Sequence, residues 1–272
     1  EEIRDTRYEI RAQTHLSNRK PTRRSAANAV SRAAFGGASM ATAGKAVSKS
    51  QVVAMAGSEY EMQTLTNWLL KQEADGTIDN ELATVISSIG VACKQIGSLV
   101  NRSGISNLTG LAGEQNVQGE DQKKLDVISN EVFCNCLRSS GRTGVIASEE
   151  EDLPVAVEET FSGDYVVVFD PLDGSSNIDA GISVGSIFGI YAPSEECSIE
   201  DMDDPETMMN KCVANVCQPG RNLLVSGYVL YSSSTVMVLT IGKGVWGFTL
   251  DPLVGEYVLS HPDIKIPETG KI

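Results

Sequence analysis

The chain has 272 residues, of which 41% are hydrophobic, and its formal net charge is −14. This length allows one large domain or two smaller ones with a full apolar core. The acidic balance argues against nucleic acid as a partner, because phosphate backbones are held by clustered Lys and Arg. No run of 18 apolar residues is present, so neither a transmembrane helix nor a membrane partner is expected.

Residues 1–57 have the composition of an organelle transit peptide. From Leu16 to Gly57 the chain contains several Arg and Lys, much Ser and Ala, and no Asp or Glu. This Arg-rich, Ser-rich and acid-poor pattern is typical of transit peptides. The alternative is a basic tail with no targeting role. In either case we exclude this segment from the predicted fold.

Three helices are predicted before residue 140. The spacing of apolar residues predicts one over Tyr60–Gln72 and another that begins after Asp79, a plausible N-cap. A glycine-rich stretch, Gly104–Gln118, reads as a mobile loop. The third helix is expected from Asp121 to Leu137. The side chains expected to face inward are Leu82, Ile86, Ile89, Cys93, Ile96 and Val100 on the second helix, and Leu125, Ile128 and Val132 on the third.

After Gly144 the pattern changes to strands. Tyr165–Phe169 is a continuous β-branched and aromatic run, which is typical of a buried strand. Helices followed by strands indicate an α/β (α+β layered) fold with stacked helix and sheet layers. A long acidic segment, residues 194–217, interrupts the strands, and a domain boundary is predicted at 218. The further predicted strands are Ser183–Tyr191, Leu223–Tyr231, Val236–Ile241, Val245–Leu250 and Glu256–Leu259.

Carboxylates are the main chemical resource of this sequence. Only two histidines occur, His15 and His261, so a Ser-His-Asp or Cys-His device is improbable. No phosphate-binding GxxxxGK[ST] loop and no GxGxxG after a strand is present. The cysteines lack CxxC spacing and lie far from the histidines, which argues against a structural zinc site.

The segment Asp170–Asn177, with sequence DPLDGSSN, combines a cation site with an anion site. Asp170 and Asp173 follow the buried strand, and Gly174 permits a sharp turn. Two carboxylates placed across such a turn are hard oxygen ligands that suit Mg²⁺. The backbone N–H groups of Gly174, Ser175 and Ser176 are expected to open a helix, where a phosphate binds well.

Two further acidic groups accompany this segment. One is the run from Glu149 to Asp152, and the other contains Glu120, Asp121 and Asp126. An acidic run alone is often only a solvated surface, and for the run at Glu149 this alternative stays open.

The chain resembles a known enzyme family. DPLDGSSN together with SEEE at 148–151 resembles the Mg²⁺-dependent, lithium-sensitive phosphatase superfamily. Four longer segments resemble the fructose-1,6-bisphosphatases in particular. These segments are Ile105–Gly113, Asn116–Phe133, Ser183–Tyr191 and Gln218–Ser233. The resemblance implies the layered sugar-phosphatase fold, hydrolysis of the 1-phosphate of fructose 1,6-bisphosphate, and assembly as a homotetramer.

The resemblance also implies individual roles. Glu149, Asp170, Asp173 and the carbonyl of Leu172 hold two or three Mg²⁺ ions, and Glu120 is a metal-linked residue on the mobile loop. Glu150 and Asp126 form the pair that activates the attacking water. Gly174 and Ser175, with Ser176 beside them, bind the 1-phosphate.

The acidic insert, residues 194–217, resembles the regulatory insert of the plastid enzymes. It contains Cys197, Cys212 and Cys217, and it looks too polar to be core. The resemblance implies a Cys197–Cys212 disulfide, with Cys217 as the alternative partner, that thioredoxin reduces to activate the enzyme. The implied location is the chloroplast stroma, with a role in the Calvin cycle and sugar synthesis. Cys93 and Cys136 lie on helix faces and are expected in the core.

The chain also departs from the family. AMP-inhibited members carry a Lys and an Arg where this chain has Asp164 and Ala192, so weak or no inhibition by AMP is expected. Family members continue well past Ile272, so residues 58–218 are expected to be the N-terminal domain and 219–272 the incomplete start of a C-terminal one. The alternatives are a sedoheptulose-1,7-bisphosphatase and a non-catalytic truncated paralogue that binds metal or pairs with full-length subunits.

Overall fold

A computed structural model describes residues 62–106, 108–115, 121–157, 163, 165–192 and 205–270. The chain divides into two units, Glu1–Val53 and Ala54–Ile272, and all described residues belong to the second. The transit-like segment, Glu120, Asp164 and Cys197 lie outside the described residues.

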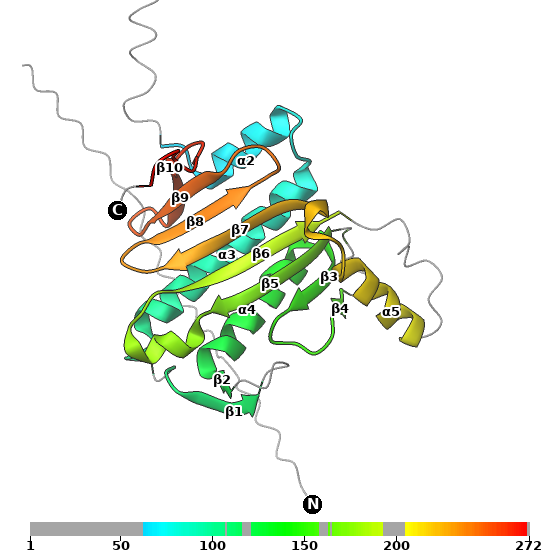
Figure 1. Cartoon of the computed structure of the whole chain (residues 1–272), viewed down its shortest axis with the longest axis vertical. Helices are drawn as coiled ribbons and strands as arrows, with labels where there is room; N and C mark the ends of the chain where they lie inside the picture. Colours follow the sequence, from blue (N-terminus) through cyan, green and yellow to red (C-terminus); the bar gives the residue numbers. More distant parts are fainter. Residues whose placement is uncertain are drawn as a thin grey trace, which may run out of the picture. The chain divides into compact units, whose positions relative to one another are not determined.

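One eight-stranded mixed sheet organises the described part of the chain (Figure 1). Its strands lie in the order β10-β9-β8-β7-β6-β5-β3-β4. All neighbours are antiparallel except β3 and β5, which are parallel. The strands are β3 Thr143–Ser148, β4 Val155–Ala156, β5 Tyr165–Asp173, β6 Val184–Tyr191, β7 Leu223–Tyr231, β8 Thr235–Thr240, β9 Trp246–Asp251 and β10 Glu256–His261.

Three helices cover one face of this sheet and bury the main core against it. They are α2 Leu65–Ala74, α3 Asn80–Arg102 and α4 Lys124–Ser140, and Figure 1 shows α3 and α4 behind the central strands. Trp68 of α2 contacts Trp246 and Phe248 of β9, with ring centroids 5.5 and 5.4 Å away. Phe133 of α4 stacks on Phe169 of β5 at 4.6 Å. These aromatic contacts join α2 to β9 and α4 to β5, on the two halves of the sheet.

The cap predicted for α3 is confirmed. The Asp79 side chain accepts a hydrogen bond from the Leu82 N–H at 2.7 Å, which satisfies one of the open donors of the first turn. Within the described residues, α3 alone is long and apolar enough to span a membrane by length and composition. Its inward residues Ile86, Ile89 and Cys93 are fully buried against the sheet, as in the core helix of a folded domain.

Two local predictions before residue 140 are corrected. The predicted loop contains strand β1, Leu111–Gln115, which pairs with β2, Asp121–Lys123, so α4 begins at Lys124 and not at Asp121. The inward face of α4 is also rotated from the expected one. Ile128 and Val132 are only half-buried. The fully buried positions recur every four residues instead, at Leu125, Ser129, Phe133 and Leu137.

The sheet continues across the predicted domain boundary at 218. β6 and β7 pair along their whole length, from Val184 opposite Tyr231 to Tyr191 opposite Leu223. Strands on both sides of the boundary thus share one hydrogen-bonded ladder and one core. Residues 219–270 therefore extend this sheet, and the assignment of residues 219–272 to the start of a further domain stays a prediction.

The acidic insert contains a helix that the sequence analysis missed. This helix, α5 (Pro205–Val216), places Cys212 in a small buried cluster with Val145, Val166 and Tyr191. Cys212 is only 5% exposed, so the expectation that the insert is too polar to be core is wrong at this residue. Val166 alternates along β5 with Val167 of the main core, so α5 lies on the sheet face opposite to α3 and α4.

Candidate active site

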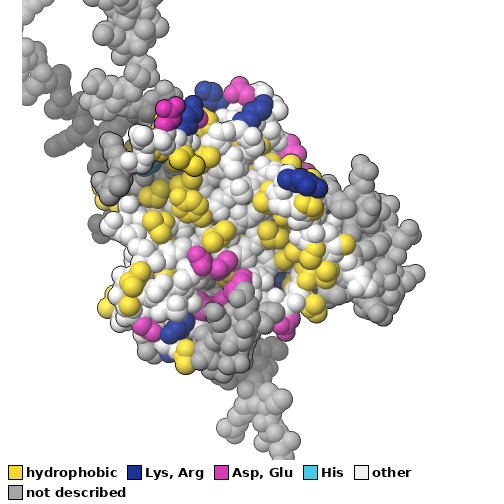
Figure 2. Space-filling model, viewed as in Figure 1, with side chains coloured by type: hydrophobic (Ala, Val, Ile, Leu, Met, Phe, Trp, Pro, Cys, Tyr) yellow, Lys and Arg dark blue, Asp and Glu magenta, His cyan; other side chains and the backbone are white. Residues whose placement is uncertain are grey.

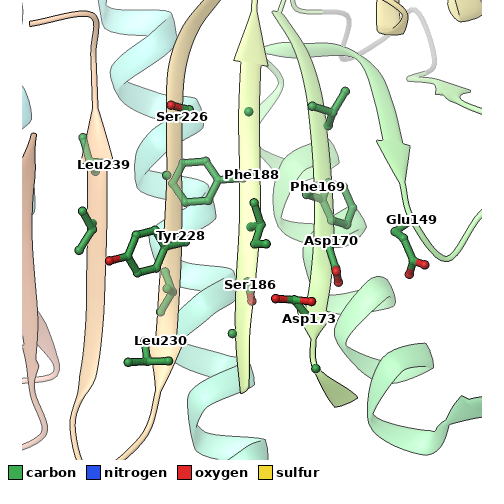
Figure 3. A pocket seen from close by; sticks show the side chains of 18 of the residues that line it. Glu149, Phe169, Asp170, Asp173, Ser186, Phe188, Ser226, Tyr228, Leu230 and Leu239 are labelled. Atoms are coloured by element: carbon green, nitrogen blue, oxygen red, sulfur yellow. The ribbon is translucent and has the colours of Figure 1, made fainter. Parts of the chain in front are cut away.

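A β-bulge in β5 brings Asp170 and Asp173 to the same face of the sheet. Residues three apart on a regular strand point to opposite faces. Here Asp170 lies opposite Ile187 of β6 and Asp173 opposite Gly185, so three steps on β5 match two on β6. The extra residue turns the strand, and both carboxylates line one cavity (Figure 3). The pairing of these two acids, predicted from a turn, is produced by a bulge within the strand.

The turn after the bulge has the predicted glycine geometry. Gly174 has φ +78°, in the left-handed region where a side chain would strain the backbone. The six-residue 3-10 helix η2, Ser175–Ala180, follows it. Ser176 is exposed, whereas Ser175 turns toward the acids, and its hydroxyl donates to Asp126 Oδ2 at 3.1 Å. Phosphate binding by this turn stays a prediction.

Glu149 lies beside Asp170 because β3 and β5 are parallel neighbours. Ser148, the last residue of β3, pairs with Phe169, and the Glu149 N–H donates to the Phe169 carbonyl at 3.0 Å. Glu149 lines the same cavity as Asp170 and Asp173. Glu150 follows in the turn, where its N–H donates to Ser148 Oγ at 3.3 Å. The run at Glu149 is therefore not only a solvated surface.

Asp126 approaches the same site from the start of α4. It is 3% exposed, and its Oδ2 accepts hydrogen bonds from the Lys123 N–H at 2.7 Å and from Ser175 Oγ at 3.1 Å. Asp126 thus caps α4 and contacts the turn that follows β5. The structure brings Asp126, Glu149, Asp170 and Asp173 together from three separate parts of the chain.

The surroundings of Asp170 raise the proton affinity of its carboxylate. Burial is the main cause that raises the pKa of Asp170 to about 6; the hydrogen bond from the Leu172 N–H opposes the rise, and the negative charges of Glu149, Asp173 and Asp126 add to it. Asp170 and Asp173 form no ion pair with Lys or Arg within the described residues. A cation would relieve this repulsion.

The donor set fits a divalent cation such as Mg²⁺, which prefers carboxylate and carbonyl oxygens. These residues do not form a complete ligand shell in this structure. Among the described residues, no three acids, histidines or cysteines lie close enough together to hold a metal ion. Glu120 lies outside the described residues. Leu172, which lies between the two aspartates in the sequence, is 3% exposed. The metal role of these residues stays a prediction.

The cavity itself has about 1060 Å³ and is mostly apolar beyond its acidic end. Its floor is the sheet face opposite α3, with half-exposed Ile187, Tyr228 and Leu230 from β6 and β7. Figure 2 shows the acidic side chains gathered beside apolar ones on this face. The sequence analysis missed this apolar floor, although the alternation in β7 carries its signal.

One contact between candidate elements was also missed. Asn130 of α4 is 7% exposed and donates to Glu151 Oε1 at 2.8 Å. It links the helix that carries Asp126 to the turn that carries Glu149 and Glu150. The residue lies four positions after Asp126 on the same helix face, which is the signal that could have found it.

The predicted cysteines fall into two groups. Cys93 is fully buried, as expected, and Cys136 is half-buried. In the insert, Cys212 is buried in α5, whereas Cys217 is exposed just after that helix. Cys197 lies outside the described residues, so the disulfide stays a prediction.

Comparison with known proteins identifies the family of the chain. The family model "Fructose-1-6-bisphosphatase, N-terminal domain" matches residues 63–262. The chain is 64% identical over 236 residues to the chloroplastic fructose-1,6-bisphosphatase of Brassica napus, covering 86% of this chain and 57% of that protein. It is 67% identical over 218 residues to chloroplastic fructose-1,6-bisphosphatase 1 of Arabidopsis thaliana, covering 79% and 52%. The chain thus spans about half the length of these curated relatives.

Solved structures give the same family. The holo form of Leishmania major fructose-1,6-bisphosphatase superposes with a TM-score of 0.70 at 37% identity, covering 77% of this chain and 61% of that one. This likeness confirms the predicted α/β layered fold, and the names of the plant relatives confirm the predicted plastid location. The chain belongs to the fructose-1,6-bisphosphatase family.

Proposed function

We propose that the protein hydrolyses the 1-phosphate of fructose 1,6-bisphosphate, giving fructose 6-phosphate and phosphate, in the plastid. The observation that carries this proposal is the cluster of Glu149, Asp170 and Asp173 in one cavity, beside the Gly174 turn. The 64% identity to a chloroplastic enzyme of that name supports the choice of substrate. The reaction serves carbon fixation and sugar synthesis.

The position of each site residue suggests its proposed role. Glu149, Asp170 and Asp173, with the Leu172 carbonyl and Glu120, would hold two or three Mg²⁺ ions, which supply neutralising charge and an acidified water when bound. Gly174, Ser175 and Ser176 would bind the 1-phosphate through their N–H groups.

Glu150 and Asp126 would accept the proton of the attacking water. The Lys123 N–H and the Ser175 hydroxyl both donate to Asp126, which fixes the orientation of its carboxylate. Because Ser175 belongs to the proposed phosphate turn, the same hydrogen bond sets the distance between the base and the phosphate. The water that this pair activates would attack the phosphorus in line with the leaving oxygen.

The first prediction is Mg²⁺-dependent phosphate release. Because the chain spans about half the length of its relatives, we would assay it alone and as a chimera in which the C-terminal part of the Brassica napus relative follows Ile272. The chimera should release phosphate from fructose 1,6-bisphosphate with Mg²⁺, and its Asp173→Ala variant should not. Turnover by Asp173→Ala at saturating Mg²⁺ would refute the assignment. Faster release from sedoheptulose 1,7-bisphosphate would favour that substrate.

We further propose regulation by a thiol switch in the insert, with thioredoxin as the reductant and a homotetramer as the assembly. The described contacts connect the insert to the strands that carry the candidate metal ligands. Cys212 packs against Val145 of β3 and Val166 of β5, the strands that lead to Glu149 and Asp170. Oxidation to a Cys197–Cys212 disulfide would close a loop and stabilise the oxidised form by at most about 3 kcal/mol. The disulfide would also hold α5 against these strands.

The second prediction concerns this switch. Oxidation should lower the activity of the chimera and dithiothreitol should restore it, whereas Cys212→Ser should be equally active in both states. Cys136→Ser on α4, outside the insert, is the matched control and should keep the response. Cys217→Ser tests which cysteine pairs with Cys212. If this variant also loses the response, the partner of Cys212 is Cys217 and not Cys197. An unchanged response in Cys212→Ser would exclude the proposed disulfide.

A further inference from the structure

The β5 bulge that carries Asp170 and Asp173 has a specific partner on β6. Two residues, Pro171 and Leu172, face the single residue Ser186 across the bulge. Bulges leave part of the hydrogen-bond ladder unpaired, and here a side chain supplies the missing donor. Ser186 Oγ donates to the Pro171 carbonyl at 2.7 Å. Figure 3 shows Ser186 on β6 beside the end of β5 that carries both aspartates.

A second hydroxyl supports the first. Tyr231 OH of β7 lies 2.7 Å from Ser186 Oγ. A hydroxyl has one proton, and that of Ser186 points to Pro171, so Tyr231 is the donor to Ser186. Ser186 is 0% exposed and Tyr231 is 3% exposed, so water does not compete for these bonds.

The two hydroxyls also lie beside a buried thiol of α3. The Cys93 thiol, fully buried on the inner face of α3, interacts with both the Tyr231 and Ser186 hydroxyls. Burial raises the pKa of Cys93 to about 12, so the thiol keeps its proton. The chain of hydrogen bonds points toward the bulge, from Tyr231 through Ser186 to Pro171.

We propose that Ser186 and Tyr231 are positioning residues that hold the Asp170–Asp173 bulge in the shape needed for cation binding. The metal part of this proposal rests on the proposed function, whereas the backbone part does not. Without the Ser186 hydroxyl, the buried Pro171 carbonyl and Tyr231 hydroxyl both lose a partner. The bulge relieves this loss by shifting, which moves the two carboxylates that flank it.

Three variants of the 272-residue chain test the proposal. Ser186→Ala removes the hydrogen bonds of Ser186 with Pro171 and with Tyr231. Tyr231→Phe removes only the bond between Tyr231 and Ser186, and Ser186→Thr keeps the hydroxyl. The control is Ser260→Ala, which removes an exposed hydroxyl pair of the same length with Thr249, 2.7 Å apart, between β9 and β10. Mn²⁺ affinity is measured by electron paramagnetic resonance at a temperature where circular dichroism shows each protein folded. Amide hydrogen exchange at Leu172 and Asp173 is measured without metal.

Ser186→Ala should weaken Mn²⁺ binding roughly 10- to 100-fold, the range typical of partners that orient metal ligands, and should speed exchange at both amides. Tyr231→Phe should show a smaller effect in the same direction, whereas Ser186→Thr and Ser260→Ala should resemble the original chain. Unchanged exchange in folded Ser186→Ala and Tyr231→Phe would overturn the proposal. An original chain that binds no Mn²⁺ would refute the proposed metal site, while faster exchange in Ser186→Ala would still support the role of Ser186 and Tyr231 in holding the bulge.

Discussion

Replacing Asp170 with asparagine is expected to stabilise the metal-free protein near neutral pH and to abolish phosphatase activity. Burial, together with Glu149, Asp173 and Asp126, raises the pKa of Asp170 from 3.8 to about 6. The folded protein therefore binds a proton at this site more readily than the unfolded chain does. The resulting stabilisation is complete below pH 3.8 and is lost as the pH rises through about 6.

Asparagine removes the charge but keeps the local geometry. Its carbonyl oxygen can still accept the hydrogen bond that Asp170 Oδ1 receives from the Leu172 N–H at 3.0 Å. The raised pKa corresponds to about 3 kcal/mol at most, and solvent screening of this half-buried carboxylate reduces the expected gain to about 1 kcal/mol above pH 6. Near pH 4 the gain should vanish, because Asp170 is then protonated.

Urea unfolding of the 272-residue chain with a chelator, between pH 4 and 8, measures this difference. The matched control is Asp179→Asn, the same chemical change at an exposed residue that pairs with Lys123 at 3.0 Å. It should lower stability by a few tenths of a kcal/mol. With Mg²⁺ the order of Asp170→Asn and the original chain should reverse, because binding stabilises only a protein that keeps its ligand. A metal-free Asp170→Asn variant that is less stable at pH 8 would contradict the assigned repulsion.

Local signals in the sequence located most of the elements. The run Tyr165–Phe169 predicted β5, and Asp79 predicted the start of α3, because both signals act over a few residues. The sequence also predicted that Asp170 and Asp173 lie together, because they follow a buried strand and precede the turn at Gly174. Their number and type pointed to cation chemistry before any geometry was known.

Long-range pairing accounts for what the sequence did not predict. The bulge that aligns Asp170 with Asp173 exists only against β6, where the single residue Ser186 lies opposite two residues of β5. The buried state of Cys212 depends on Val145 and Val166, which are far away in sequence. Likewise, Ser186 has no motif of its own, and only the β5–β6 register places it opposite the bulge.

Replacing Asp126 is expected to separate catalysis from helix capping. The carboxylate accepts from the Lys123 N–H at 2.7 Å and from Ser175 Oγ at 3.1 Å. Asp126→Asn can keep both bonds through its carbonyl oxygen but cannot take a proton from water. We expect its turnover number in the chimera to fall roughly 10²- to 10⁴-fold, as for loss of a general base, with little change in stability.

Asp126→Ala provides the comparison, because it loses the base and the cap together. Its activity should fall as far as that of Asp126→Asn, and its free energy of unfolding should fall by about 1 kcal/mol more. Glu131→Gln, an acid-to-amide change at an exposed site on the same helix, should leave both quantities unchanged. If Asp126→Asn turned over normally while Asp126→Ala was unstable, Asp126 would serve only as a cap, and Glu150 alone would remain the candidate base. The difference between the two variants therefore assigns the buried carboxylate to chemistry or to folding.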